Sequence, residues 1–109
     1  MTNNKDLLTW AAKAAGIPTD NWNDGTEPYS SGEGFILASG RIWNPLDDDG
    51  DAFRLSTKLE LSIDYAKWTH TVFYGVDKFV QEDWHDKDSH IAIRRAIVRA
   101  AAELGKAMQ

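Results

Sequence analysis

The chain contains no cysteine among its 109 residues. Disulfide bridges, thiolate metal sites and a thiol nucleophile are therefore excluded, and a reducing compartment suits the composition. Long apolar runs are also missing, because no segment approaches the roughly 20 apolar residues of a membrane-spanning helix. Residues 1–18 contain an early acidic residue, Asp6, and lack the apolar core of a signal peptide. We therefore expect a cytoplasmic protein with no membrane partner.

Basic residues are in the minority. The chain has 12 lysines and arginines against 17 aspartates and glutamates, which gives a net charge of −5 at pH 7. Residues 1–64 carry 5 basic and 11 acidic side chains, hence −6, whereas residues 65–109 carry 7 and 6, hence +1. Nucleic-acid-binding domains usually show a basic stripe, so we expect no nucleic-acid partner. The charge asymmetry is suited to orienting the domain on a protein.

Hydrophobic residues are plentiful, at 42% of the chain with five tryptophans. Such a chain is expected to form a single domain over residues 1–109 with one core. Residues 18–34 are rich in turn-forming residues and predict a long loop, and loops of that length are either functional or mobile. Trp22 and Tyr29 are expected to hold this loop to the body.

Three segments have the periodicity of amphipathic helices, near residues 4–15, 50–59 and 89–107. Asn3 or Asn4 can cap the first helix, and Gly16 with Pro18 ends it. Asp88 or Ser89 can cap the last helix. In that helix the expected sheet-facing stripe is Ile93, Ala96, Ile97, Ala100, Leu104 and Met108. Its expected solvated side is Arg95, Arg99, Glu103 and Lys106.

Two regions have the pattern of β-structure. Residues 35–43 predict a hairpin with Gly40 in its turn, and residues 61–82 predict a three-stranded antiparallel meander with turns near Trp68 and Asp77. Together with the helices they predict an α+β fold in which a small antiparallel sheet is layered with helices. The aromatic residues of the meander are expected to form its packing face, and not a platform for stacking nucleobases: Tyr65, Trp68, Phe73, Tyr74 and Phe79.

The acidic run around Gly50 raises the question of calcium. With Gly50 at the sixth position of an EF-hand loop, Pro45 would fall at the first and Ser56 at the twelfth. Neither supplies the carboxylate that those positions need. The alternative is that Asp48, Asp49 or Asp51 caps the helix near 50–59. A weak cation site or a partner-binding site remains a second reading of the run.

Catalytic signals are weak. His85 and His90 lie near aspartates, but their spacing does not place both imidazoles on one helical face. A nucleophile elbow and a phosphate-binding glycine loop are both missing. We therefore expect no enzymatic activity, no metal and no cofactor, with a metal-dependent hydrolase using His85 and His90 as the weakest alternative.

The segment "WNPLDDDGDAFRLSTKL", the short meander and the terminal "AIRRAIVRAAAELG" together resemble the small phage and prophage proteins grouped as the phage ABA sandwich domain. The resemblance covers residues 35–106, and its motifs are residues 43–54 and 93–105. It implies an α/β layered fold and a phage or prophage origin, hence the cytoplasm of a host cell. It implies no activity, because the family has no established catalytic or binding residues to transfer.

The favoured hypothesis is a phage- or prophage-encoded accessory protein, a non-enzymatic module that binds a host or phage protein. Trp10, Trp22 and Trp84 are expected to be exposed aromatics. The alternative is a nucleic-acid-binding protein that uses Arg94, Arg95 and Arg99. The candidate partner surface consists of Trp22, Asp47, Asp48, Trp84, Arg95 and Arg99.

Overall fold

A computed structural model describes residues 3–25, 32–84 and 88–108. Three helices lie in this part of the chain: α1 (Asn4–Ala15), α2 (Asp49–Lys58) and α3 (Ser89–Ala107). The strands are β1 (Trp22–Asp24), β2 (Glu33–Ile36), β3 (Ile42–Trp43), β4 (Ser62–Ala66), β5 (Thr69–Gly75) and β6 (Lys78–Asp83). The fold class is α+β, which confirms the prediction.

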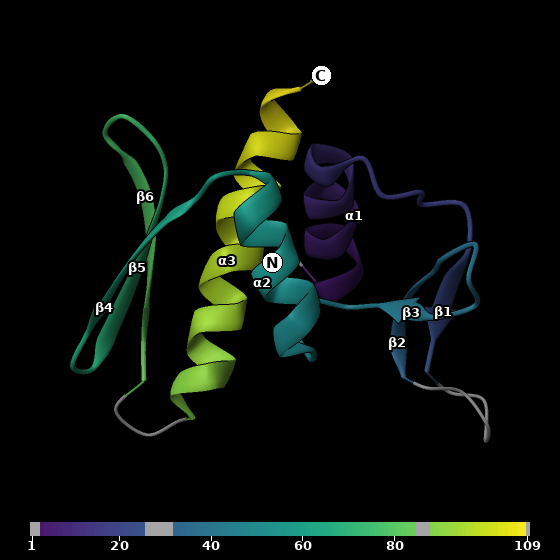
Figure 1. The fold of residues 1–109 in the computed structure, drawn as a ribbon, viewed down its shortest axis with the longest axis horizontal. Helices are drawn as coiled ribbons and strands as arrows, with labels where there is room; N and C mark the ends of the chain where they lie inside the picture. Colours follow the sequence, from purple (N-terminus) through teal and green to yellow (C-terminus); the bar gives the residue numbers. More distant parts are fainter. Residues whose placement is uncertain (1–2, 26–31, 85–87, 109) are drawn as a thin grey trace.

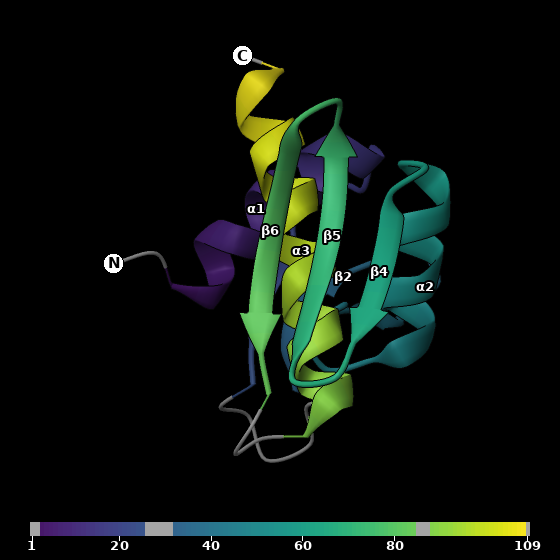
Figure 2. The same cartoon turned by 90° about the vertical axis from the view of Figure 1, so that its left-hand side faces the viewer.

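Helix α3 occupies the middle of the molecule (Figures 1 and 2). The sheet β4-β5-β6 covers one side of it, and α1 and α2 lie on other sides. The hairpin strands β2 and β3 do not extend that sheet. They join β1 in a separate sheet of order β1-β2-β3, which lies beyond the helices. The sequence pattern predicts one sheet that contains both the hairpin and the meander. In the structure they belong to two separate sheets, with the helices between them.

The helices begin at side-chain caps. Asn3 accepts a hydrogen bond from the Asp6 amide at 2.8 Å, and Gly16 ends α1 at a φ of 73°, the left-handed conformation that glycine adopts without strain. Asp48 caps α2 by accepting from the Asp51 amide at 2.7 Å. Asp88 caps α3 by accepting from the His90 amide at 2.7 Å. The acidic run therefore does start a helix, as the sequence predicted.

Helix α3 is buried on more than the one predicted face. It packs most extensively on α1 and also contacts α2, β5 and β6. Ile97 of the predicted stripe is buried at 4% exposure, but Met108 at its end is exposed. On the predicted solvated side, the Arg95 and Arg99 side chains are 43% and 37% exposed, and both also reach Glu82 of β6. The additional buried positions of the helix are Ala92, Val98, Ala101, Ala102 and Gly105.

The large sheet packs on α3 through aliphatic residues rather than its phenylalanines. Val72 pairs with Val80 across β5 and β6, and both are buried. The neighbouring pair, Phe73 and Phe79, points to the opposite face because side chains alternate along a strand, and these rings are 38% and 51% exposed. The predicted packing face was therefore wrong for Phe73 and Phe79, and also for Tyr65 of β4, which is 66% exposed. Trp68 lies in the β4–β5 turn at a φ of 76°.

The predicted loop over residues 18–34 contains regular structure. Trp22 pairs with Phe35 and Asn23 with Gly34, so β1 adds a strand to the hairpin. The rings of Trp22 and Phe35 meet edge to face at 5.0 Å, which ties this segment to the core as expected of Trp22. Tyr29, expected to do the same, lies outside the described residues.

Candidate protein-binding groove

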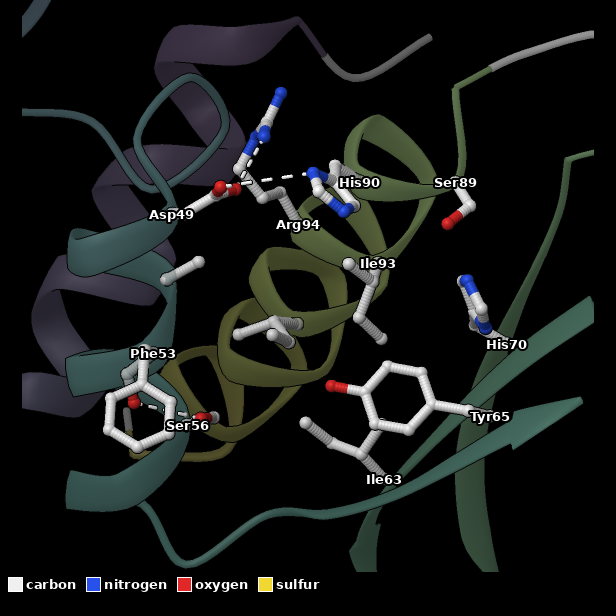
Figure 3. A pocket seen from close by; sticks show the side chains of 12 residues that line it. Asp49, Phe53, Ser56, Ile63, Tyr65, His70, Ser89, His90, Ile93 and Arg94 are labelled. Carbon is white, nitrogen blue, oxygen red and sulfur yellow. Dashed lines mark hydrogen bonds and ion pairs between the residues drawn. The ribbon is translucent and has the colours of Figure 1, made fainter.

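A groove runs between α2 and β4, with α3 as its floor (Figure 3). Each element presents side chains at its own natural period. The α2 wall uses the spacing i, i+3, i+4 and i+7: Asp49, Ala52, Phe53 and Ser56. The floor repeats that spacing along α3: His90, Ile93, Arg94 and Ile97, with Ser89 beside them. The sheet wall uses the period of two: Ile63 and Tyr65 from β4, backed by His70 of β5.

The groove is apolar at its base and aromatic at its rims. It encloses about 440 Å³. Ala52 and Ile97 are buried in the base, and Ile63 and Ile93 are half-buried. Phe53 on the α2 rim and Tyr65 on the β4 rim are 70% and 66% exposed. Such aromatic exposure on both sides of an apolar depression is typical of interaction sites, where the partner removes the rings from water.

One end of the groove is polar but internally paired. Arg94 donates from Nη1 to Oδ1 of Asp49 at 2.6 Å and from Nε to the Leu46 carbonyl at 2.8 Å. His90 Nδ1 lies 3.9 Å from Oδ2 of Asp49. These contacts fix the start of α2 against α3 (Figure 3). The pairing of Asp49 with Arg94 leaves the groove close to neutral.

His70 is the unusual residue of the lining. It is only 5% exposed, and neither ring nitrogen has a hydrogen-bond partner of normal geometry among the described residues. Its ring stacks on Trp84 at 5.6 Å and meets the edge of Tyr65 at 5.2 Å. Burial lowers the pKa of His70, and the backbone of Ser89 acts less strongly in the opposite direction. Most buried polar groups in proteins are well hydrogen-bonded, so this weakly paired imidazole is an unfavourable feature of the lining.

The acidic run contributes a structural centre rather than an open site. The Asp51 side chain is fully buried and receives three hydrogen bonds, from Arg41 and Arg54 at 2.8 Å each and from the Asn44 amide at 3.0 Å. Burial alone would raise the pKa of Asp51, but the hydrogen bonds from these groups outweigh it and hold the pKa below its ordinary value. Asp51 thus joins the hairpin to α2.

The six residues of the predicted partner surface lie on different elements. Trp22 is in β1, and Trp84 follows β6, where its ring contacts Trp68 and His70. Trp22 and Trp84 are half-buried, as is Trp10, so the expectation of freely exposed tryptophans was wrong. Asp48 caps α2, and Asp47 accepts a long 3.4 Å hydrogen bond from the Asn44 side chain.

The three arginines considered for nucleic-acid binding are bound to acidic groups of the chain itself. Arg94 binds Asp49 as described above. Arg95 Nε lies 3.6 Å from Glu82, and Arg99 forms a closer ion pair with the same carboxylate. Arg99 also donates to the Gln81 carbonyl at 2.9 Å. Their cationic groups are therefore neutralised locally rather than arranged as a stripe for phosphates.

The histidine hypothesis can be followed only in part, because His85 lies outside the described residues. His90 lines the polar end of the groove next to Asp49. Within residues 3–25, 32–84 and 88–108, no cluster of three or more metal-ligating side chains is placed to hold an ion.

No family model matches the chain, and neither the curated proteins nor the solved structures include a match to it. In the described part of the chain, none of the helices has the length and apolar character that crossing a bilayer requires.

The sequence contained signals for each wall of the groove but not for the groove itself. The alternation in β4 and the helical spacing in α3 place Ile63, Tyr65, Ile93 and Ile97 on inward faces. The helical period of residues 50–59 favours burial of Phe53 beside Ala52 and Leu55, but the structure leaves Phe53 70% exposed, and no local signal marks His70. The missing information is that α2 and the sheet both pack on α3, with the groove lying between them.

Proposed function

We propose that the chain is a non-enzymatic protein-interaction module that binds a partner in the groove between α2 and β4. The observation that carries the proposal is the combination of an apolar base with exposed rings on both rims, Phe53 and Tyr65. Rigid aromatic side chains around a pocket are the residues that most often dominate binding energy in protein interfaces.

The lining favours binding over catalysis. Its ionised groups are the Asp49–Arg94 pair at one end, which is held by hydrogen bonds within the chain. The base consists of aliphatic side chains. A protein surface with apolar side chains is the ligand class that this chemistry suits best.

The experiment compares matched surface variants in an affinity capture. Phe53→Ser with Tyr65→Ser removes both rims, and both rings are exposed, so folding should be little affected. Phe73→Ser with Phe79→Ser removes two exposed rings from the outer face of the same sheet as the control. Wild-type and variant proteins are used as bait in lysate of the organism that carries the gene, with quantitative mass spectrometry.

The proposal predicts a partner that wild type and the outer-face variant retain and that the groove variant loses. Purified partner should then bind the groove variant at least about tenfold more weakly, the loss expected for anchor residues worth over 1 kcal/mol. A partner retained by the groove variant and lost by the outer-face variant would place the interface elsewhere and refute the proposal.

We also propose that the module acts in the cytoplasm of a host cell as a phage or prophage accessory protein. The support is the resemblance over residues 35–106 to the phage ABA sandwich domain. The genes on either side test it: phage structural or regulatory genes are expected, and a neighbourhood of unrelated housekeeping genes would contradict it.

A further inference from the structure

The two edge strands of the large sheet, β6 and β4, differ in how far they are blocked against pairing with a further strand. At β6, Arg99 donates a hydrogen bond to the Gln81 carbonyl, and Arg95 and Arg99 both lie against Glu82. The β5–β6 pairing also contains an irregularity between Phe73 and Gly75. Charged side chains and bulges of this kind are the features by which proteins block an edge strand against further pairing.

Strand β4 is less protected, with one exposed charged residue, Asp64, and no ion pair or irregularity of that kind among the described residues. It pairs with β5 in unbroken register from Ser62 to Ala66 and forms the opposite edge of the sheet. It contains neither a proline nor a described bulge, and the described residues offer it no backbone partner on its outer side. An edge of this kind presents unpaired N–H and C=O groups that can receive one more strand.

The open edge of β4 borders the groove. A strand added beside β4 would continue the sheet toward α2, so every second side chain would lie next to Ile63 and Tyr65. Those side chains would enter the groove above Ile93 (Figure 3), next to the part of the lining that Ile97 forms. The volume of about 440 Å³ suits a few side chains, whereas an inserted helix is about 10 Å or more across.

His70 is a weakly hydrogen-bonded polar group beside the groove. It sits behind β4, paired with Tyr65 across the ladder, and lines the groove; beyond the weak effect of the Ser89 backbone, its ring nitrogens lack a well-formed hydrogen bond among the described residues. A hydrogen-bonding group brought in by a ligand would remove the cost of this weak pairing. The charges of Asp49 and Arg94 cancel each other, which favours apolar side chains in the groove. The net charge of the chain, −5, favours basic residues on either side of those apolar side chains.

We infer that the groove binds an extended peptide segment of the partner, which adds a strand to β4, inserts alternate apolar side chains and hydrogen-bonds His70. The inference rests on the proposed function and names the form in which the partner binds.

The first arm of the test identifies the form of the ligand. A library of random linear peptides is selected on the wild-type protein, and the affinity of one purified peptide is measured by fluorescence polarisation. Strand addition predicts apolar residues at every second position. It also predicts that N-methylation of alternate backbone amides weakens binding at least tenfold, because the methyl group removes a ladder donor, while methylation of the intervening amides has little effect.

The second arm tests His70. His70→Phe keeps an aromatic ring that can stack on Trp84 and removes both weakly paired ring nitrogens. The variant should melt at or above the wild-type temperature and yet bind the selected peptide at least fivefold more weakly. A residue with a purely structural role would lose stability instead, and unchanged peptide affinity would refute the assignment of His70.

Three results would overturn the inference. Selected peptides could carry apolar residues at i, i+3 and i+4 with no alternation in the N-methyl series, which indicates a bound helix. The selection could yield no peptide whose binding the Phe53→Ser, Tyr65→Ser variant weakens. The wild type could sediment as a dimer that this variant dissociates, which would make a second copy the occupant of the edge. If groove-dependent capture of a folded partner persists in these cases, the proposed function stands and only the extended form is wrong.

Discussion

At the scale of single residues, Asp51 shows how a buried charge is stabilised. Its carboxylate receives hydrogen bonds from Arg41 of the hairpin, Arg54 of α2 and the Asn44 amide. A buried carboxylate without such partners would be strongly unfavourable. Because the partners belong to two elements, Asp51 stabilises the position of the hairpin relative to α2 as well as the helix start.

Asp51→Asn should lower the free energy of unfolding by about 1–3 kcal/mol at neutral pH, since it removes charge-assisted hydrogen bonds. The pKa of Asp51 is held below its ordinary value of 3.8 in the folded state. The stabilisation is therefore complete above pH 3.8 and is lost as pH falls through the lower folded pKa. Urea unfolding of wild type and variant across the acid range measures this. A stability difference that stays constant throughout would contradict the account.

Only part of this site was predictable. Asp48 as a helix cap follows from local chemistry, because a cap bonds an amide three residues along the chain. The burial of Asp51 depends on Arg41, which approaches from a hairpin ten residues earlier. His70 is similar, since nothing in its neighbours in sequence indicates that Trp84 and Tyr65 will enclose it.

At the scale of elements, Gly105 of α3 allows α1 and α3 to pack closely, because it has no side chain. A Cβ added to Gly105 would lie 1.9 Å from the Trp10 carbonyl oxygen. Gly105→Ala should therefore destabilise the protein by about 1–3 kcal/mol through overpacking, although alanine is the better helix former. Urea unfolding tests this against Gly75→Ala in β5, where the nearest atoms are side-chain carbons of Lys78 at 3.5 Å or more. Equal effects for the two variants would refute the close approach.

The orientation of α3 gives a second test at this scale. Ile97 is 4% exposed, so Ile97→Ala should cost about 2–5 kcal/mol through lost burial and a cavity. Arg95→Ala removes only a partly exposed ion pair with Glu82 and should cost at most about 1 kcal/mol. Thermal unfolding compares the two, and similar losses would mean that the helix is rotated from its described position.

Periodicity identified most elements but not always the side that packs. In β5 and β6 it separated Val72 and Val80 from Phe73 and Phe79, yet both sets are apolar. The choice between the faces is made by α3, whose small side chains accept the valines. The same limit applies to Arg95 and Arg99. The helical pattern places them on one side of α3, but only the folded structure shows that both side chains reach Glu82 of β6.

At the scale of the whole molecule, charge decides against nucleic acid. The net charge is −5, and the three arginines of α3 are paired with Asp49 and Glu82. We expect no measurable affinity for duplex DNA at about 0.15 M salt, by fluorescence anisotropy. Micromolar binding that weakens steeply with salt, and that Arg94→Glu with Arg99→Glu abolishes, would contradict this.

The overall class was predictable from local patterns, whereas the arrangement was not. The sequence pattern places the hairpin and the meander in one sheet, because nothing local distinguishes one sheet from two. The groove has the same origin: it exists because α2 and the sheet both rest on α3 without covering each other (Figures 1 and 2).

The most direct test of the groove as the binding site is amide hydrogen exchange with and without the partner or selected peptide. The account predicts slower exchange at residues 62–66 of β4 and at residues 49–56 of α2, with β6 unchanged. Protection confined to β6, to α1 or to the sheet β1-β2-β3 would show that the groove is not where this protein binds.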